Sequence, residues 1–128
     1  MKIELFTLCD GAFNYNGKLT IVGTIDGIRV HQIPSKETLN IAMKLLAQKN
    51  EAVNSDLVID IYNPDGIKIP SQVSCRINIE PKEEISHISL AAVVQGVPFN
   101  QEGVYTINVS LGQEKLEEYT FFVKRKSA

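Results

Sequence analysis

The sequence predicts an all-β fold in which two antiparallel sheets pack face to face as a sandwich. Apolar and polar residues alternate strictly from Tyr105 to Leu111, the pattern of a strand with one face in a core and the other in water. Two sequences typical of tight turns, Asn16-Gly17 and Asn63-Pro64-Asp65-Gly66, separate other apolar segments. No segment shows a convincing helical pattern, so strands and turns account for the chain.

The length and composition indicate a single domain over residues 1–128. With 44% hydrophobic and 22% charged residues, the chain has a globular composition and is long enough to bury a core without disulfides or metals. Its net charge of -2 offers no general attraction for nucleic acid or for an anionic membrane, so neither is an expected partner. The basic run Lys124-Arg125-Lys126 is interpreted as a solubilising tail.

The N-terminal residues favour a cytoplasmic location. Charged residues interrupt the apolar ones in Met1–Asp10 before a run long enough for a secretory signal or a membrane span can form. The two cysteines, Cys9 and Cys75, are then expected to stay reduced, as is usual for intracellular proteins. Cys75 alternates in register with Val73 and Ile77, which predicts that its side chain is buried.

The first elements are a strand and a hairpin. Residues 2–9 form the strand. Asn16-Gly17 then joins residues 13–15 to residues 18–23, and this dipeptide is typical of type I′ hairpin turns, whose two central residues both need positive φ.

A short strand and an ambiguous segment come next. Asp26-Gly27 allows a bend into residues 28–30, and Pro34 ends that unit because proline cannot donate a hydrogen bond to a sheet. Residues 39–49 alternate as a strand does, yet their Ala, Leu, Met and Lys content favours a helix. Because alternating segments flank this stretch on both sides, we predict a strand, and a helix crossing the sandwich is the alternative.

The second half of the chain predicts further short strands separated by turns. Residues 55–62 and 67–69 flank the turn at Asn63–Gly66 and make a second hairpin. The remaining predicted strands cover residues 73–79, 85–95, 105–111 and 117–124. Seven to nine strands result.

The spacing of these strands favours an immunoglobulin-like Greek-key sandwich. Strands recur about every ten residues with turns of suitable chemistry, as in that fold. Tyr105 follows the polar loop Gln101-Glu102-Gly103, which suits a tyrosine corner, where the phenol hydroxyl bonds to backbone upstream. The cysteine and tryptophan hallmarks of antibody domains are absent.

The turn motifs also occur in a specific order. They are Leu8-Cys9-Asp10-Gly11-Ala12, Asn16 to Gly23, Ile28, Pro34, Asn63 to Gly66 and Phe99 to Tyr105. This order resembles an uncharacterised family of small bacterial all-β sandwich proteins, and the resemblance covers nearly the whole chain. It implies a bacterial origin and a sandwich fold. Members of that family have no known catalytic activity, so the resemblance implies no site residues.

The residues that could carry chemistry form no recognisable site in the sequence. His31 and His87 are the only histidines, and neither has acids or cysteines at a metal-ligand spacing, so we interpret them as surface or strand-end residues. A nucleophilic pair of either histidine with Cys9 or Cys75 would need a tertiary contact. No glycine-rich phosphate loop, GxSxG or HExxH motif occurs. We therefore predict no catalytic residue, no metal ligand and no cofactor.

Two weaker patterns suggest ligands, and each has a simpler explanation. Asp56, Asp60 and Asp65 surround one predicted loop, where some sandwiches bind calcium, but the turn explains Asp65 and Asp60 lies on a polar face. Three aromatic residues could offer a platform for sugar or peptide, although packing within a hairpin is the preferred interpretation. They are Phe13, Tyr15 and Tyr62.

The function is unknown from the sequence, and two classes of hypothesis remain. The first is a non-enzymatic protein-interaction or structural module whose sheet edges or hairpin loops contact another protein or a second copy. The alternative is a small-ligand-binding or hydrolytic β-sandwich with a site built from loop carboxylates and histidines.

Phe122 is the candidate interface residue. The final predicted strand, residues 117–124, turns Tyr119, Phe121 and Val123 inward and Phe122 outward. An open sandwich has edge strands with unpaired backbone groups, which natural proteins protect or pair. We therefore expect a homodimer, or contact with a protein partner, with Phe122 at the interface.

Overall fold

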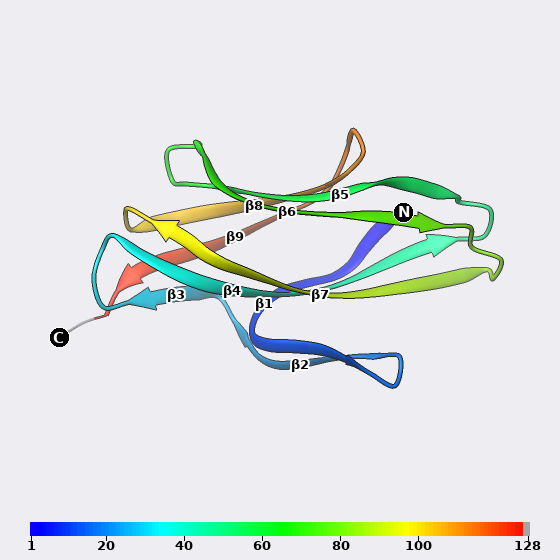
Figure 1. Cartoon of the computed structure of the whole chain (residues 1–128), viewed down its shortest axis with the longest axis horizontal. Helices are drawn as coiled ribbons and strands as arrows, with labels where there is room; N and C mark the ends of the chain where they lie inside the picture. Colours follow the sequence, from blue (N-terminus) through cyan, green and yellow to red (C-terminus); the bar gives the residue numbers. More distant parts are fainter. Residues whose placement is uncertain (127–128) are drawn as a thin grey trace.

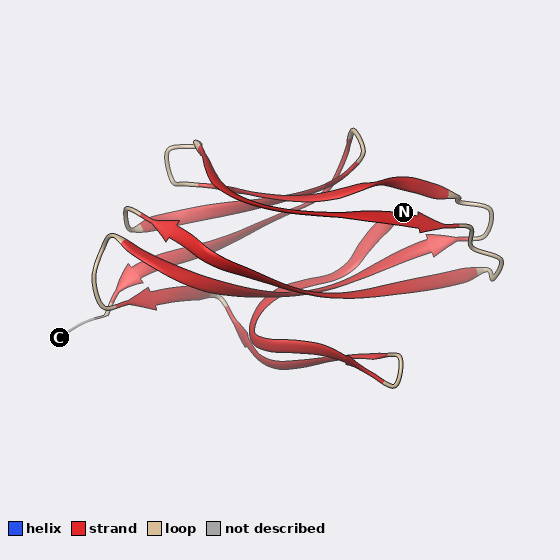
Figure 2. Cartoon of the chain, in the orientation of Figure 1, coloured by secondary structure: helices blue, strands red, loops and turns tan. Residues whose placement is uncertain are grey.

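The computed structural model describes residues 1–126, which form two stacked sheets without a helix (Figure 1 and Figure 2). The strands of this part of the chain are β1 (Lys2–Tyr15), β2 (Lys18–Ile25), β3 (Gly27–Val30), β4 (Ser35–Gln48), β5 (Val53–Tyr62), β6 (Lys68–Ile79), β7 (Ile85–Phe99), β8 (Gly103–Leu111) and β9 (Glu114–Arg125). The predicted sandwich of seven to nine strands is confirmed.

The two sheets have four and five strands. Their orders are β2-β1-β4-β7 and β3-β9-β8-β5-β6. All pairs among the described strands are antiparallel except β3 with β9, which is parallel. Strands adjacent in space are often distant in the chain, as in a Greek key.

The ambiguous segment at residues 39–49 is strand. It forms most of β4, between β1 and β7, and its alternate side chains are buried in the core: Leu39, Ile41, Met43, Leu45 and Ala47. Burial of one whole face between two sheets outweighs a helix propensity that differs by less than about 1 kcal/mol per residue.

Two turns adopt the geometry that their residues predict. Asn16 and Gly17 have φ values of 50° and 73°, which identifies the β1–β2 turn as type I′. In the β5–β6 turn the side-chain oxygen of Asn63 accepts the backbone N–H groups of Asp65, at 2.9 Å, and Ile67, at 3.0 Å. This side chain replaces backbone partners that the turn cannot supply.

The tyrosine corner is confirmed at Tyr105. Its buried hydroxyl donates to the carbonyl oxygen of Gln101 at 2.8 Å, four residues upstream. Burial raises the pKa of the Tyr105 phenol, and the backbone hydrogen bonds only partly oppose this shift. The ring packs against Phe99, at 5.1 Å between centroids, and against Phe121, at 5.7 Å. The corner thus joins β8 to β9 and to the end of β7.

The β1–β2 hairpin leaves the body of the sheet, as Figure 1 shows below β4 and β7. The first half of β1, to Cys9, pairs with β4, and the remainder pairs with β2. Ala42 alternates with the core residues of β4 and so faces outward, yet it is fully buried. The hairpin covers this part of the outer face, where the side-chain amide of Asn14 donates to the carbonyl of Ser89 at 3.4 Å.

Two strand boundaries differ from the prediction. The predicted strands 67–69 and 73–79 merge, except for Ile67, into the single strand β6, which begins at Lys68 and continues through Pro70. Pro70 is tolerated because β6 is an edge strand that pairs only with β5, so one side of its backbone needs no donor.

Candidate interaction site

The histidines do not assemble a catalytic or metal site. His87 Nε2 lies 3.3 Å from Glu4 Oε2, and His31 Nε2 lies 3.5 Å from Lys126 Nζ, all on the surface. Within residues 1–126, no group of three His, Cys, Asp or Glu side chains could hold a metal ion. Neither histidine contacts a cysteine, so the nucleophilic pair does not form in this part of the chain.

The three aspartates of the considered calcium site have separate partners. Asp56 pairs with Arg76 at 3.2 Å, and Asp60 lies 3.6 Å from Lys68. Asp65 accepts a hydrogen bond from Gln101 at 3.2 Å. They are strand and turn carboxylates with ordinary surface contacts.

The prediction that Cys75 is buried is wrong. Both thiols are free, and Cys9 is buried, but Cys75 is exposed on the edge strand β6. Residue alternation correctly turns Cys75 toward the space between the sheets, but at this position that space is an open groove. Burial of the sulfur against the groove walls is nevertheless the main cause that raises the pKa of the Cys75 thiol, and the Asp56 carboxylate raises it further.

Cys75 lies at an apolar groove of about 330 Å³ between β6 and β7. The groove is lined by Ile41 and Met43 of β4, Leu57 and Ile59 of β5, Val73 and Cys75 of β6, and Leu90 to Val93 of β7. The β4 and β5 residues belong to the main core. The gap between the two sheets is therefore open along this side, and a molecule in the groove would contact core residues.

The β7 edge beside the groove is unusual in its charge. β7 pairs only with β4, and its 15 residues, Ile85–Phe99, include no Lys, Arg, Asp or Glu. Natural proteins protect such an edge with charges, prolines or bulges, and β7 has Pro98 and a shift of register between Val94 and Val97, so its unprotected part is residues 85–94. Val93, at the middle of the strand, is 58% exposed. The sequence shows the missing charge, but it does not show that β7 is an edge.

Phe122 does not lie on an edge strand, so the reasoning that selected it needs correction. β9 pairs with β8 on one side and with β3 on the other. Phe122 faces outward from this interior strand, with the Arg29 guanidinium carbon and Lys124 Nζ each 5.0 Å from the ring centroid. Lys124 and Arg125, interpreted above as a tail, are also part of β9.

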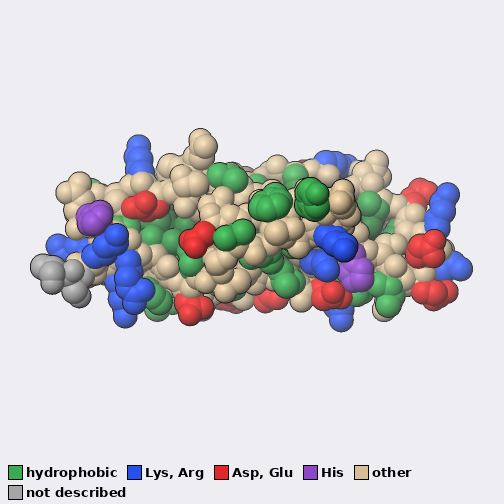
Figure 3. Space-filling model, turned by 90° about the horizontal axis from the view of Figure 1, so that it is seen from below, with side chains coloured by type: hydrophobic (Ala, Val, Ile, Leu, Met, Phe, Trp, Pro, Cys, Tyr) green, Lys and Arg blue, Asp and Glu red, His purple; other side chains and the backbone are tan. Residues whose placement is uncertain are grey.

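The aromatic residues considered as a platform are not brought together. Phe13 and Tyr15, on the β1–β2 hairpin, are 50% and 65% exposed, so packing within the hairpin does not bury them. Tyr62 belongs to the other sheet, with Lys68 Nζ 5.9 Å from its ring centroid. Figure 3, which views the molecule from the hairpin side, shows hydrophobic side chains at the middle of this face.

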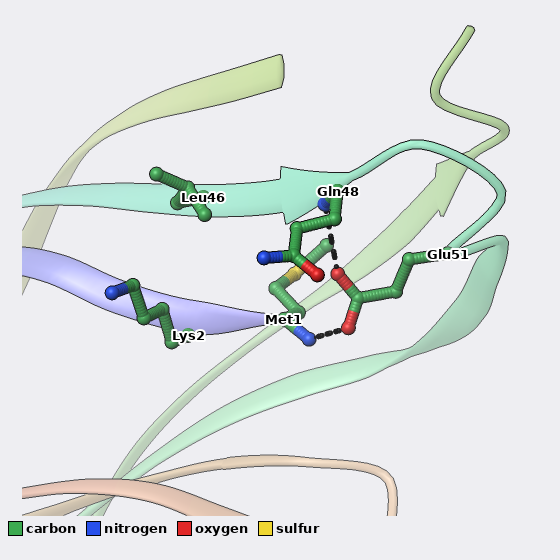
Figure 4. A pocket seen from close by; sticks show the side chains of 5 residues that line it. All are labelled: Met1, Lys2, Leu46, Gln48 and Glu51. Carbon is green, nitrogen blue, oxygen red and sulfur yellow. Dashed lines mark hydrogen bonds and ion pairs between the residues drawn. The ribbon is translucent and has the colours of Figure 1, made fainter. Parts of the chain in front are cut away.

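A second hollow, of about 230 Å³, lies beside the N-terminus (Figure 4). The Glu51 carboxylate pairs with the amino group of Met1 and accepts the backbone N–H of Gln48 at 3.0 Å. Both carboxylate oxygens are engaged, so this hollow offers structural contacts rather than a reactive group. The structure also shows, for residues 1–126, no helix with the length and apolar character that a membrane crossing requires.

Comparison with solved structures agrees with the sandwich fold. The C-terminal domain of wzt superposes with a TM-score of 0.52 at 12% sequence identity, covering 99% of this chain and 74% of that one. An immunoglobulin-like protein from Pseudomonas aeruginosa, PA1606, gives a TM-score of 0.41 at 13% identity and covers 95% and 94% of the two chains. At 12% identity the likeness to the wzt domain concerns the fold alone.

Sequence comparison identifies a family but no function. No curated protein matches the chain. The model of a family of unknown function, DUF6941, matches residues 4–124, which include all nine strands almost completely. The predicted likeness to an uncharacterised family is thereby confirmed, and the chain belongs to the DUF6941 family of unknown function.

Proposed function

We propose that this domain is a non-enzymatic protein-interaction module that forms a homodimer by pairing β7 with β7 of a second copy. The observation that carries the proposal is the uncharged 15-residue edge beside a groove that reaches the core. A free edge offers unpaired backbone donors and acceptors to another strand.

The side chains of β7 suit pairing with an identical strand. An antiparallel pair centred on Ala91 places Ser89 opposite Val93 in both halves, so small neutral side chains meet and like charges do not. On the inner face the same arrangement brings apolar residues opposite each other and continues the core across the pair. Asn14, which contacts the carbonyl of Ser89, would release this long hydrogen bond.

We infer that the domain acts in the cytoplasm and that its interaction requires no nucleic acid, membrane or cofactor. Two free thiols support this location. The hydrolytic alternative is not favoured, because the histidines and the aspartates lie apart in the described residues.

Multi-angle light scattering tests the dimer. We expect about twice the mass of the 14.2 kDa chain for the native protein, and a monomer for Val93→Lys, since a lysine at the centre of the edge opposes an identical strand. Val104→Lys is the matched control, because Val104 is also 58% exposed but lies on the interior strand β8. This control should remain dimeric.

Three results would contradict the proposal. They are a native monomer, a dimer that Val93→Lys leaves intact, and a dimer that Val104→Lys dissociates equally well. A native monomer that binds a small apolar molecule in the groove would instead support the ligand-binding alternative.

A further inference from the structure

A second surface lies on the outer face of β3, β8 and β9. Phe122 is opposite Gly27 of β3 and Val104 of β8, and the neighbouring pair along β3 and β9 is Arg29 with Lys124. We call Arg29, Val104, Phe122 and Lys124 the cationic platform. It lies at the end of the molecule where Figure 3 shows basic side chains gathered.

The ring of Phe122 lies directly on the backbone of β3. A Cβ atom added to Gly27 would be 2.6 Å from the ring, so the absence of a side chain there allows the close contact. Arg29 and Lys124 both direct their positive charge at this ring, each at 5.0 Å from its centroid. The electron-rich face of the ring attracts each cation, while the two cations repel each other.

The cations of the platform have no carboxylate partner in residues 1–126: neither Arg29 nor Lys124 takes part in an ion pair there. Glu102 does not pair with either cation: its Oε1 accepts the backbone N–H of Arg125 at 2.6 Å, and its carboxylate forms no ion pair in the described residues. An added anion would therefore find two positive charges already oriented beside an aromatic surface.

At the opposite end of the same outer face, cations and carboxylates are paired with each other. There the carboxylates have cationic partners: Asp56 with Arg76 at 3.2 Å and Glu118 with Lys115 at 2.8 Å. The face thus changes from unpartnered cations to partnered carboxylates along its length.

We propose that the cationic platform binds an acidic segment of a protein partner, separate from the β7 edge. Carboxylates of that segment would contact Arg29 and Lys124, and an apolar side chain between them would pack on Phe122 and Val104, which is 58% exposed. A short acidic segment fits because the positive area is small. A long polyanion such as duplex DNA would also meet the carboxylates along this face, in a chain of net charge -2.

Fluorescence anisotropy with a labelled synthetic peptide of alternating Glu and Leu residues tests the platform. We expect binding that weakens when salt rises from about 50 to about 200 mM, and that falls at least about tenfold in Arg29→Gln/Lys124→Gln. Lys49→Gln/Lys82→Gln removes the same charge from exposed positions in loops elsewhere and should bind as the native protein does. Phe122→Leu should weaken binding less than the double charge variant.

Controls distinguish peptide binding at the cationic platform from dimerisation and from the binding of other polyanions. Val93→Lys should still bind the peptide, and a native circular dichroism spectrum of each variant shows that it is folded. The proposal is overturned if the peptide does not bind the native protein, if its Gln–Leu counterpart binds equally, or if the two double variants behave alike. It is also overturned if single-stranded DNA or phosphatidylserine vesicles bind more tightly than the peptide.

Discussion

The two long sides of the sandwich differ in how the gap between the sheets is closed. On one side the chain itself passes between the sheets from β2 to β3, and Tyr119 of β9 fills the gap. Its hydroxyl donates to the carbonyl of Ile25 at 3.3 Å, and its ring lies 5.1 Å from that of Phe6. On the other side β6 and β7 are both edges, and the short side chains of Cys75 and Ala92 leave the groove.

This difference indicates where the fold can accept a partner. Where the chain crosses from one sheet to the other, it covers the core permanently, because the crossing segment is continuous with the strands on both sides of the gap. Two edge strands joined only through residues 80–84 leave both their backbone groups and the core beneath them accessible. The closed side is thus structural, and the open side is the one that we assign to interaction.

The largest expected effect comes from truncating the same residue type on each side. Leu8 is fully buried on the closed side, whereas Leu90 is half-buried at the groove. Leu8→Ala should destabilise the monomeric Val93→Lys protein by about 3 kcal/mol, and Leu90→Ala by about 1 kcal/mol, because the open groove already exposes part of Leu90. Urea unfolding measures both. Equal losses would mean that the groove is closed in solution.

Removal of one hydroxyl should have a smaller effect. Tyr105→Phe leaves the Gln101 carbonyl without its 2.8 Å partner and should cost about 1 kcal/mol. Tyr119→Phe, which removes the longer 3.3 Å bond on the closed side, is the comparison and should cost less. A loss at Tyr119 as large as that at Tyr105 would show that the closed side depends on this bond more than its length suggests.

The tyrosine corner also predicts a dependence on pH. Because the folded state raises the pKa of Tyr105, it favours the neutral phenol. This contribution is complete below the ordinary tyrosine pKa of about 10 and is lost as pH rises through the raised value. Between these values the native protein should lose more stability than Tyr105→Phe does. Parallel alkaline unfolding curves for the two proteins would contradict this expectation.

The reactivity of the two thiols tests the difference in exposure between Cys9 and Cys75 without a further mutation. In the folded Val93→Lys monomer Cys75 should react with iodoacetamide and Cys9 should not, since Cys9 is buried. Reaction at Cys75 should still accelerate above the usual thiol range, because its pKa is raised. Denatured, unreduced protein should show two free thiols. Mass spectrometry after digestion assigns the sites, and labelling of Cys9 first would reverse the proposed order of exposure.

Removal of divalent metal ions should leave the thermal stability of the protein unchanged. Two carboxylates on the outer face of β5 have cationic partners, Asp56 with Arg76 and Asp60 with Lys68, so we expect that they need no metal ion. The melting temperature should therefore be equal in chelator and in calcium, as differential scanning fluorimetry can measure. A marked drop in chelator would reinstate a site at these aspartates.

Much of the fold could be predicted because its signals are local. The Asn16-Gly17 turn needs two residues with positive φ, and the alternation of β8 matches a strand with one buried face. Even Tyr105 could be placed, since the hydroxyl and its acceptor are four residues apart. The candidate site could not be predicted in the same way, since Cys75 and Leu90 approach each other across two sheets.

The local order of residues is enough to predict most strand segments, their apolar faces and the main turns. Which strands are edges depends on the three-dimensional strand order. The pairing of β9 with β3, for example, joins residues that lie far apart in the chain, and no local pattern indicates it. For this reason the sequence analysis selected Phe122, which lies on an interior strand, and could not show that β7 is an edge. Alternation fixes the face that a side chain occupies, but strand order decides whether anything covers it.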